Sequence, residues 1–257
     1  MTLHKTTPNT PKYLTAIHGW GFNRAVWDEL GDQLKTDYAF DAIDLPGFGQ
    51  SSMLAGEYTL SMLADSVAES LPSPSVLMGW SLGGLVALEV ARRYPERIEA
   101  LVMVASAPRF TATEDWPHGV VRDVLDAFSE TLAQDYKTAL SRFLILQAGR
   151  TDLGRATVKK LKPLLFRHGA PNRKALEEGL VLLRETDLRS ALGTLRQPVL
   201  FILGARDNFL SPSVETDLRR LRPDCQVAVI EGSAHAPFIS HPTEFLGVLF
   251  PFLQNIH

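Results

Sequence analysis

Three residues at separate points of the chain, Ser81, Asp207 and His235, are of the types that together turn a hydroxyl into a nucleophile. A serine hydroxyl reacts poorly at neutral pH, so it needs an imidazole to take its proton and a carboxylate to hold that imidazole in one tautomer. Each of the three follows an apolar run that is typical of a buried strand. Because parallel strands bring their carboxyl ends to one edge of a sheet, we expect these side chains to meet there and catalyse acyl transfer.

The segment around Ser81 is typical of a strand, a sharp turn and a helix. An apolar run leads into Gly-Trp-Ser-Leu-Gly at 79–83, and a helical pattern follows over 85–94. The turn strains the backbone of Ser81, and side chains two positions before or after it would collide, which explains the two glycines. The Leu82 N–H, at the start of the helix, would then point at an oxyanion formed on an attacked carbonyl. The alternative is a glycine-rich turn with an idle serine, because the five-residue pattern alone is weakly specific.

A second loop, His-Gly-Trp-Gly at 18–21, lies between a predicted strand at 13–17 and a helical pattern over 24–34. Glycines on both sides of Trp20 let the backbone turn tightly and approach a ligand. We interpret the Trp20 N–H as a second oxyanion donor and expect His18 to shape the loop. A plain turn with a core tryptophan is the alternative.

Composition excludes several classes of protein. The chain has 257 residues, 45% of them hydrophobic, and a net charge of −3, which argues against a nucleic-acid partner. A single cysteine, Cys225, permits no internal disulfide and suits a reducing compartment. We expect a cytoplasmic protein, because residues 1–12 lack the apolar centre of a signal peptide and no span is long enough to cross a bilayer. No metal-ligand spacing and no phosphate-binding glycine loop occurs, so we expect no cofactor and no metal.

The order of predicted elements indicates an α/β fold. Strand and helix patterns alternate as far as the strand predicted at 99–106, and they resume with a strand at 198–203. Such alternation predicts a mostly parallel central sheet flanked by helices. In between, apolar residues recur at helical spacing, which indicates a helical lid insertion. We therefore divide the chain into a first core part at 1–108, a lid at 109–190 and a second core part at 191–257.

The lid carries a concentrated positive charge. Ten basic residues and one acid, Asp152, lie between Lys137 and Lys174, which leaves 16 basic against 28 acidic residues elsewhere. An acidic protein with one basic segment steers an anionic partner to that segment. The alternative is the solvated outer face of lid helices, although such faces usually mix both signs of charge.

The chain resembles the α/β-hydrolase superfamily and, within it, the pimeloyl-[acyl-carrier protein] methyl ester carboxylesterases of biotin synthesis. Five stretches across almost the whole chain carry the resemblance: His-Gly-Trp-Gly at 18–21, Asp-Leu-Pro-Gly-Phe-Gly at 44–49, Gly-Trp-Ser-Leu-Gly-Gly-Leu-Val at 79–86, Arg-Phe-Leu at 142–144 with Gln147, and Ala-His-Ala-Pro-Phe-Ile-Ser-His-Pro at 234–242. The tryptophans at 20 and 80, the lid stretch and the last stretch are specific to this family.

The resemblance implies a serine carboxylesterase that hydrolyses the methyl ester of a pimeloyl chain on acyl-carrier protein. We also expect a monomer that accepts small esters as surrogate substrates. It implies Ser81, Asp207 and His235 as catalytic residues. Substrate contacts are expected at Trp20, Leu82, Phe143, Leu144, Ile145, Leu146 and Gln147. Carrier contacts are expected at Arg142, Arg155, Lys159 and Lys162, although Lys159 stands where the family has arginine. Two alternatives remain open: a broad short-chain carboxylesterase without a carrier, and a ligand receptor that keeps the three residues without turnover.

Overall fold

Short apolar runs form a six-stranded sheet with strand order β2-β1-β3-β4-β5-β6, in which every neighbouring pair is parallel. The structure, a computed structural model, describes residues 12–53, 55–149 and 151–256. The strands are β1 (Tyr13–Ile17), β2 (Ala39–Ile43), β3 (Ser75–Trp80), β4 (Ile98–Val104), β5 (Val199–Gly204) and β6 (Gln226–Ile230). Every residue of β3 is buried, as its unbroken apolar run predicts for a central parallel strand. The α/β fold expected from the sequence is confirmed.

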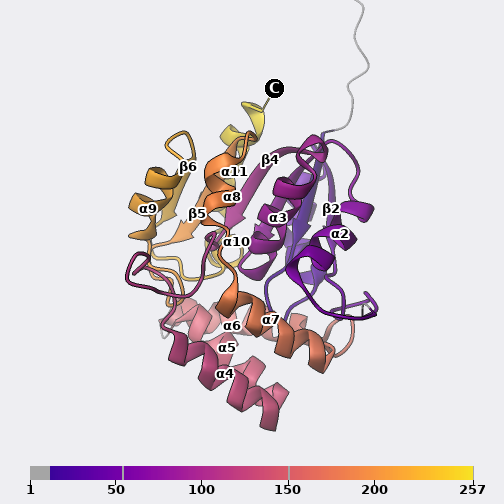
Figure 1. Ribbon diagram of the computed structural model, residues 1–257, viewed down its shortest axis with the longest axis vertical. Coiled ribbons are helices and arrows are strands. Elements are labelled where there is room, and N and C mark those ends of the chain that lie inside the picture. Colours follow the sequence, from indigo (N-terminus) through magenta and orange to yellow (C-terminus); the bar gives the residue numbers. More distant parts are fainter. Residues whose placement is uncertain (1–11, 54, 150, 257) are drawn as a thin grey trace, which may run out of the picture.

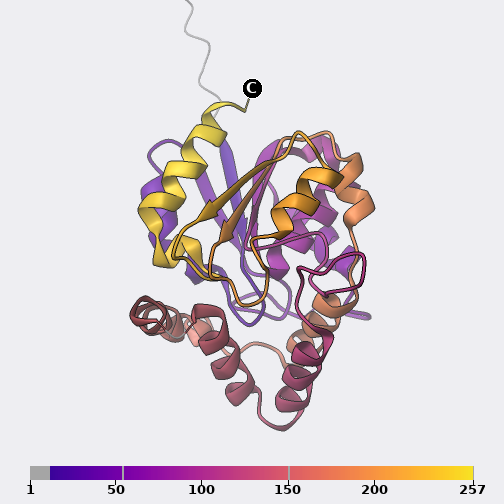
Figure 2. The same ribbon diagram turned by 90° about the vertical axis from the view of Figure 1, so that its left-hand side faces the viewer.

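Helices cover both faces of this sheet. On one face α3 packs against β3 and β4, and on the other α11 packs against β5 and β6 (Figure 2). The core helices are α1 (Asp28–Leu34), α2 (Leu60–Ser70), α3 (Leu82–Arg93), α8 (Arg189–Thr194), α9 (Val214–Leu221), α10 (Pro237–Ser240) and α11 (Pro242–Gln254), with 3-10 turns η1 (Arg24–Trp27) and η2 (Pro95–Arg97). In the part of the chain described, no helix combines the length and apolar character needed to cross a membrane.

Between β4 and β5 the chain leaves the sheet and forms a separate group of helices. These are α4 (Arg122–Gln134), α5 (Tyr136–Ala148), α6 (Asp152–Leu161) and α7 (Arg173–Glu185), with the 3-10 turn η3 (Lys162–Phe166). The group lies beyond the carboxyl ends of the strands (Figure 1). These helices lie within residues 109–190, the predicted lid, whose exact boundaries stay a prediction.

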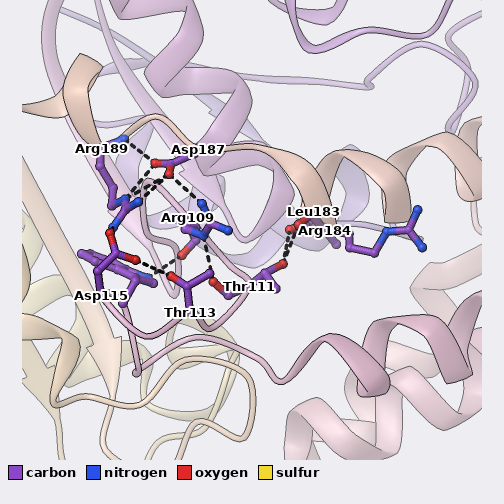
Figure 3. A network of polar contacts seen from close by, with 9 residues as sticks. Arg109, Thr111, Thr113, Asp115, Leu183, Arg184, Asp187 and Arg189 are labelled. Carbon is purple, nitrogen blue, oxygen red and sulfur yellow. Dashed lines mark hydrogen bonds and ion pairs between the residues drawn. The ribbon is translucent and has the colours of Figure 1, made fainter.

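The two chain segments that connect the lid to the core lie side by side and are clamped together. Asp187 accepts hydrogen bonds from Arg109 and Arg189 at 2.7 Å each, and Arg189 also pairs with Asp115 at 2.8 Å (Figure 3). Leu188 N–H donates to the Pro108 carbonyl at 2.8 Å. Burial alone would raise the pKa of Asp187, but hydrogen bonds from the arginines outweigh it and hold this pKa at about 2. The lid therefore starts and ends at one charged joint.

Candidate active site

Ser81 lies at the sharp turn between β3 and α3. Its φ of 54° and ψ of −120° are the strained conformation that the motif predicts. A methyl group on Gly79 would clash with the Gly83 carbonyl, and one on Gly83 would lie 2.5 Å from the carbonyl oxygens of Ile17 and His18. Only glycine fits at these two positions, so the turn lifts Ser81 above the sheet edge.

The structure brings Ser81, Asp207 and His235, which together form the candidate catalytic triad, into one hydrogen-bonded line. His235 Nδ1 lies 2.7 Å from Asp207 Oδ2, and His235 Nε2 lies 2.9 Å from Ser81 Oγ. An ionised carboxylate can only accept, so Nδ1 carries the proton and Nε2 is left to accept from the serine hydroxyl. Asp207 follows β5 and His235 follows β6, so all three side chains come from strand carboxyl ends.

Neighbouring groups fix this line in place. Asp207 Oδ1 accepts from the backbone N–H of Phe209 at 2.8 Å and of Leu210 at 3.2 Å, which leaves Oδ2 for the imidazole. The Trp80 indole N–H donates to the His235 carbonyl at 2.7 Å. The His235 N–H in turn donates to the Gln147 carbonyl of the lid at 3.1 Å. The imidazole is therefore held from both the core and the lid.

Two backbone N–H groups are free to stabilise an oxyanion. The Leu82 N–H lies at the start of α3, where the helix dipole favours negative charge. The Trp20 indole N–H is occupied, because it donates to the Leu176 carbonyl at 2.9 Å. For the backbone N–H groups of Trp20 and Leu82, the described residues supply no acceptor. The expected oxyanion donors thus keep both of these N–H groups available.

Aromatic side chains of the core and the lid cover the three residues. His235 is 0% and Ser81 3% exposed. Phe143 of α5 stacks on Phe209 with ring centroids 4.8 Å apart, and it lies 4.8 Å from the Trp20 ring. Phe209 in turn meets the His235 ring edge-on at 5.0 Å. This layer excludes water, which strengthens the electrostatic interactions beneath it.

The predicted substrate-contacting run 143–147 divides between two faces of α5. Phe143, Leu144 and Gln147 are buried, whereas Ile145 is 55% exposed and Leu146 is half-buried. Successive helix residues differ by about 100° in direction, so five in a row cannot line one channel. The structure therefore places Ile145 on the outer surface, away from the triad.

Gln147 carries an unusual buried amide. Its side chain is 0% exposed, yet neither Oε1 nor Nε2 has a hydrogen-bond partner within the described residues. An unpaired buried amide costs about 1–3 kcal/mol, so such a group in a native fold needs an explanation. A hydrogen bond from this amide to a polar group of a bound molecule would explain it.

The predicted carrier-binding cations, Arg142, Arg155, Lys159 and Lys162, are all exposed on the lid. Arg155 pairs with Asp152 on its own helix. Other basic residues of the segment from Lys137 to Lys174 also have acidic partners: Lys160 with Glu29 at 3.3 Å, Arg167 with Asp28 at 3.0 Å and Arg173 with Glu177 at 2.8 Å. The positive charge is therefore partly neutralised, and Arg150 lies outside the described residues.

Sequence reasoning missed several supporting residues. Besides Phe209 and the Trp80 indole, Ser106 donates from Oγ to the Ser81 carbonyl at 2.9 Å. Ser106 is the second residue after β4, so its place at the same sheet edge was the available signal. His18 shapes the Trp20 loop as predicted: Nδ1 donates to the Gly19 carbonyl at 2.9 Å, and Nε2 accepts from Leu45 N–H at 3.0 Å. In the described part of the chain, no group of three metal-ligating side chains gathers.

The chain is similar in sequence to known hydrolases and esterases. A family model described as the alpha/beta hydrolase fold matches residues 14–242. The chain is 42% identical to a pimeloyl-[acyl-carrier protein] methyl ester esterase of Aeromonas hydrophila, over 93% of this chain and 94% of that protein. It is 41% identical to a protein of the same name from Sodalis glossinidius, over 97% and 96%.

Solved structures share the fold. An esterase from Exiguobacterium antarcticum superposes with a TM-score of 0.86 at 22% identity, covering 96% of this chain and 93% of that one. A hydrolase from Pseudomonas aeruginosa superposes with a TM-score of 0.80 at 26% identity, covering 94% and 90%.

Proposed function

We infer the function from the premise that the chain belongs to the alpha/beta hydrolase fold family. We propose that it is a serine carboxylesterase that hydrolyses the methyl ester of pimeloyl-[acyl-carrier protein] methyl ester in biotin synthesis, releasing methanol. Relatives about 40% identical over most of the chain carry that name. The observation that carries the proposal is the line from Asp207 through His235 to Ser81, with contacts of 2.7 and 2.9 Å.

In the first half of the reaction, Ser81 Oγ attacks the ester carbonyl while His235 Nε2 takes its proton. The negative charge that develops on the carbonyl oxygen is stabilised by the backbone N–H groups of Trp20 and Leu82. Asp207 stabilises the imidazolium and holds its orientation. His235 then gives the proton to the methoxy oxygen, and methanol leaves the acyl-enzyme.

In the second half, water replaces methanol. His235 Nε2 takes a proton from the water, whose oxygen attacks the acyl-enzyme carbonyl, and the same two N–H groups stabilise the oxyanion. The proton returns to Ser81 Oγ as the acyl–serine bond breaks. The products are the regenerated serine and the free carboxylic acid, which releases its proton to solvent and becomes the carboxylate.

The acyl chain is proposed to lie beneath the aromatic layer, against Phe143 and Leu144. These buried apolar side chains suit the methylenes of a dicarboxylic monoester. The unpaired Gln147 amide is then placed to hydrogen-bond a carbonyl of the substrate, which would remove its buried deficit. The Ile145 side chain is 55% exposed, so it is not assigned a contact with the acyl chain. Carrier contacts are proposed at Arg142, Arg155, Lys159 and Lys162, on the outer surface of the lid.

The direct test is Ser81→Ala with the carrier-bound methyl ester as substrate and methanol release as the readout. We expect an unchanged circular-dichroism spectrum and a fall in kcat of at least about a thousandfold. Substantial residual hydrolysis would exclude Ser81 as the nucleophile. Growth of a biotin-requiring strain without its own esterase tests the physiological role, and expression of this chain should restore it.

The carrier distinguishes the proposal from a general esterase. Attachment of the acyl chain to its carrier should raise kcat/KM, and added salt should lower that gain while leaving a small neutral ester almost unaffected. Equal kcat/KM for both substrates at all salt concentrations would favour a broad short-chain esterase. Absence of steady turnover on any short ester would favour a receptor. We further propose a cytoplasmic monomer, which gel filtration and cell fractionation would test.

A further inference from the structure

A surface groove of about 640 Å³ crosses the seam between the lid and the core. One side is formed by α5 and the turn after it, and the other by the loop after β5. Its lining includes Arg142, Ile145, Leu146, Thr151, Arg206 and Asn208. Arg206 and Asn208 are the immediate neighbours of Asp207, so the groove lies next to the candidate catalytic carboxylate.

The last turn of α5 contacts both a residue that lines this groove and the backbone of His235. On its outer side the Leu146 carbonyl accepts from Asn208 Nδ2 at 2.8 Å. One residue later, the Gln147 carbonyl accepts from the His235 N–H at 3.1 Å. The groove therefore adjoins the helix turn that contacts the backbone of the catalytic histidine, at the place where lid and core meet.

The groove combines two uncompensated positive charges with exposed apolar surface. Arg142 and Arg206 are both exposed, and within residues 12–53, 55–149 and 151–256 neither guanidinium forms an ion pair. The Arg142 side chain makes one hydrogen bond, to Thr131 Oγ1 at 3.2 Å. Ile145, which lines the same groove, exposes 55% of its surface. Two other lid cations, Lys160 and Arg167, are by contrast paired with acids of the core.

We propose that this groove binds the phosphopantetheine arm that joins the acyl chain to its carrier, with the phosphodiester held between Arg142 and Arg206. The inference rests on the proposed function and assigns a role to Arg206, which lies outside the basic lid segment. A guanidinium binds phosphate oxygens through paired, charge-assisted hydrogen bonds. Ile145 and Leu146 contact the methylene and methyl groups of the arm, which explains an apolar side chain at an exposed position.

A second groove, of about 420 Å³ between α4 and α5, is the competing place for the arm. It shares Arg142 and Leu146 with the first groove, but its remaining lining is apolar except for Thr131 and Asp123. A carboxylate there repels a phosphodiester, and no second arginine offsets it. Charge complementarity therefore favours the groove that contains Arg206.

The test compares two small thioesters of monomethyl pimelate, one on 4′-phosphopantetheine and one on pantetheine without the phosphate. The measured quantity is the ratio of their kcat/KM values, so any general loss of triad geometry cancels. Wild-type protein should prefer the phosphorylated substrate by at least about tenfold, because hydrogen bonds between a guanidinium and a phosphate are charge-assisted.

Arg206→Gln and Arg142→Gln should each bring that ratio close to one, and Arg206→Lys should restore part of it. Arg196→Gln is the matched control. Arg196 is an exposed arginine beside a separate pocket near Pro95, and its substitution removes the same charge. It should keep the wild-type ratio.

The outcomes separate two failures. A wild-type ratio near one, or an equal loss in the Arg196 control, overturns the groove assignment while leaving the esterase intact. If the protein releases methanol from neither of the two small substrates nor from the carrier-bound methyl ester, the proposed function itself is overturned.

Discussion

His18 is expected to make the fold sensitive to mild acid. Its ring is 0% exposed, and its two hydrogen bonds, to the Gly19 carbonyl and from the Leu45 N–H, require a neutral imidazole. Burial lowers the pKa of His18 from 6.5 to about 4, against smaller raising effects of the Gly19 carbonyl and the Asp44 charge. A proton would have to displace the Leu45 N–H from Nε2.

The sign and size of the effect follow from linkage. Because the pKa is lower in the folded protein, the unfolded chain binds the proton first as the pH falls. The contribution of His18 is complete above pH 6.5 and is lost progressively down to about pH 4. At pH 4.5 the loss amounts to about 2.5 kcal/mol of unfolding free energy, a large share of the stability of an ordinary domain.

Urea unfolding between pH 7.5 and 4.5, followed by tryptophan fluorescence, measures this loss. His18→Gln removes the titrating group, so its unfolding free energy should fall by about 2.5 kcal/mol less than that of the wild type over the same interval. Parallel pH profiles for the wild type and His18→Gln would refute the reasoning.

Three further changes test other parts of the structure. Asp187→Asn should lower the unfolding free energy, measured by urea unfolding, by about 1–2 kcal/mol at pH 7. The wild type should lose the same contribution as the pH falls from about 4 to 2, because the carboxyl protonates in that range and its pKa is lower in the folded protein. Gly179→Ala would put a methyl group 2.8 Å from the Trp20 ring, so kcat should fall about tenfold as the oxyanion loop shifts, whereas an unchanged kcat would show that the loop tolerates displacement. Ser106→Ala removes the hydrogen bond to the Ser81 carbonyl, and kcat should fall by a factor of about five with KM little changed.

Much of the candidate site could be predicted because it depends on local patterns. A strand-like run ends directly before Ser81, and two others end three residues before Asp207 and five before His235. A parallel sheet brings such ends together whatever the details of its packing. The strand at 13–17 was predicted with its observed bounds. The strained turn at Ser81 follows from two glycines whose steric roles depend only on nearby backbone.

The lid was harder to predict because its side chains are positioned by tertiary contacts. Helical spacing indicated that α5 exists, but not that the Ile145 side chain would be exposed while that of Gln147 is buried. The charge count over the lid did not show that Lys160 and Arg167 pair with acids of α1. Arg206 was overlooked because its significance depends on Arg142, which is distant in sequence and meets it only across the lid–core seam.

The hydrogen bond from His235 to the Gln147 carbonyl has a consequence for evolution and for engineering. The insertion enters and leaves through one joint, so exchanging it between relatives looks like a simple transplant. A transplanted segment must nevertheless end a helix with a peptide oxygen at that same spot, or the recipient's imidazole loses one of its anchors. Changes in recognition of the carrier-linked arm should therefore accumulate along the outer face of α5, while its final turn stays geometrically constant.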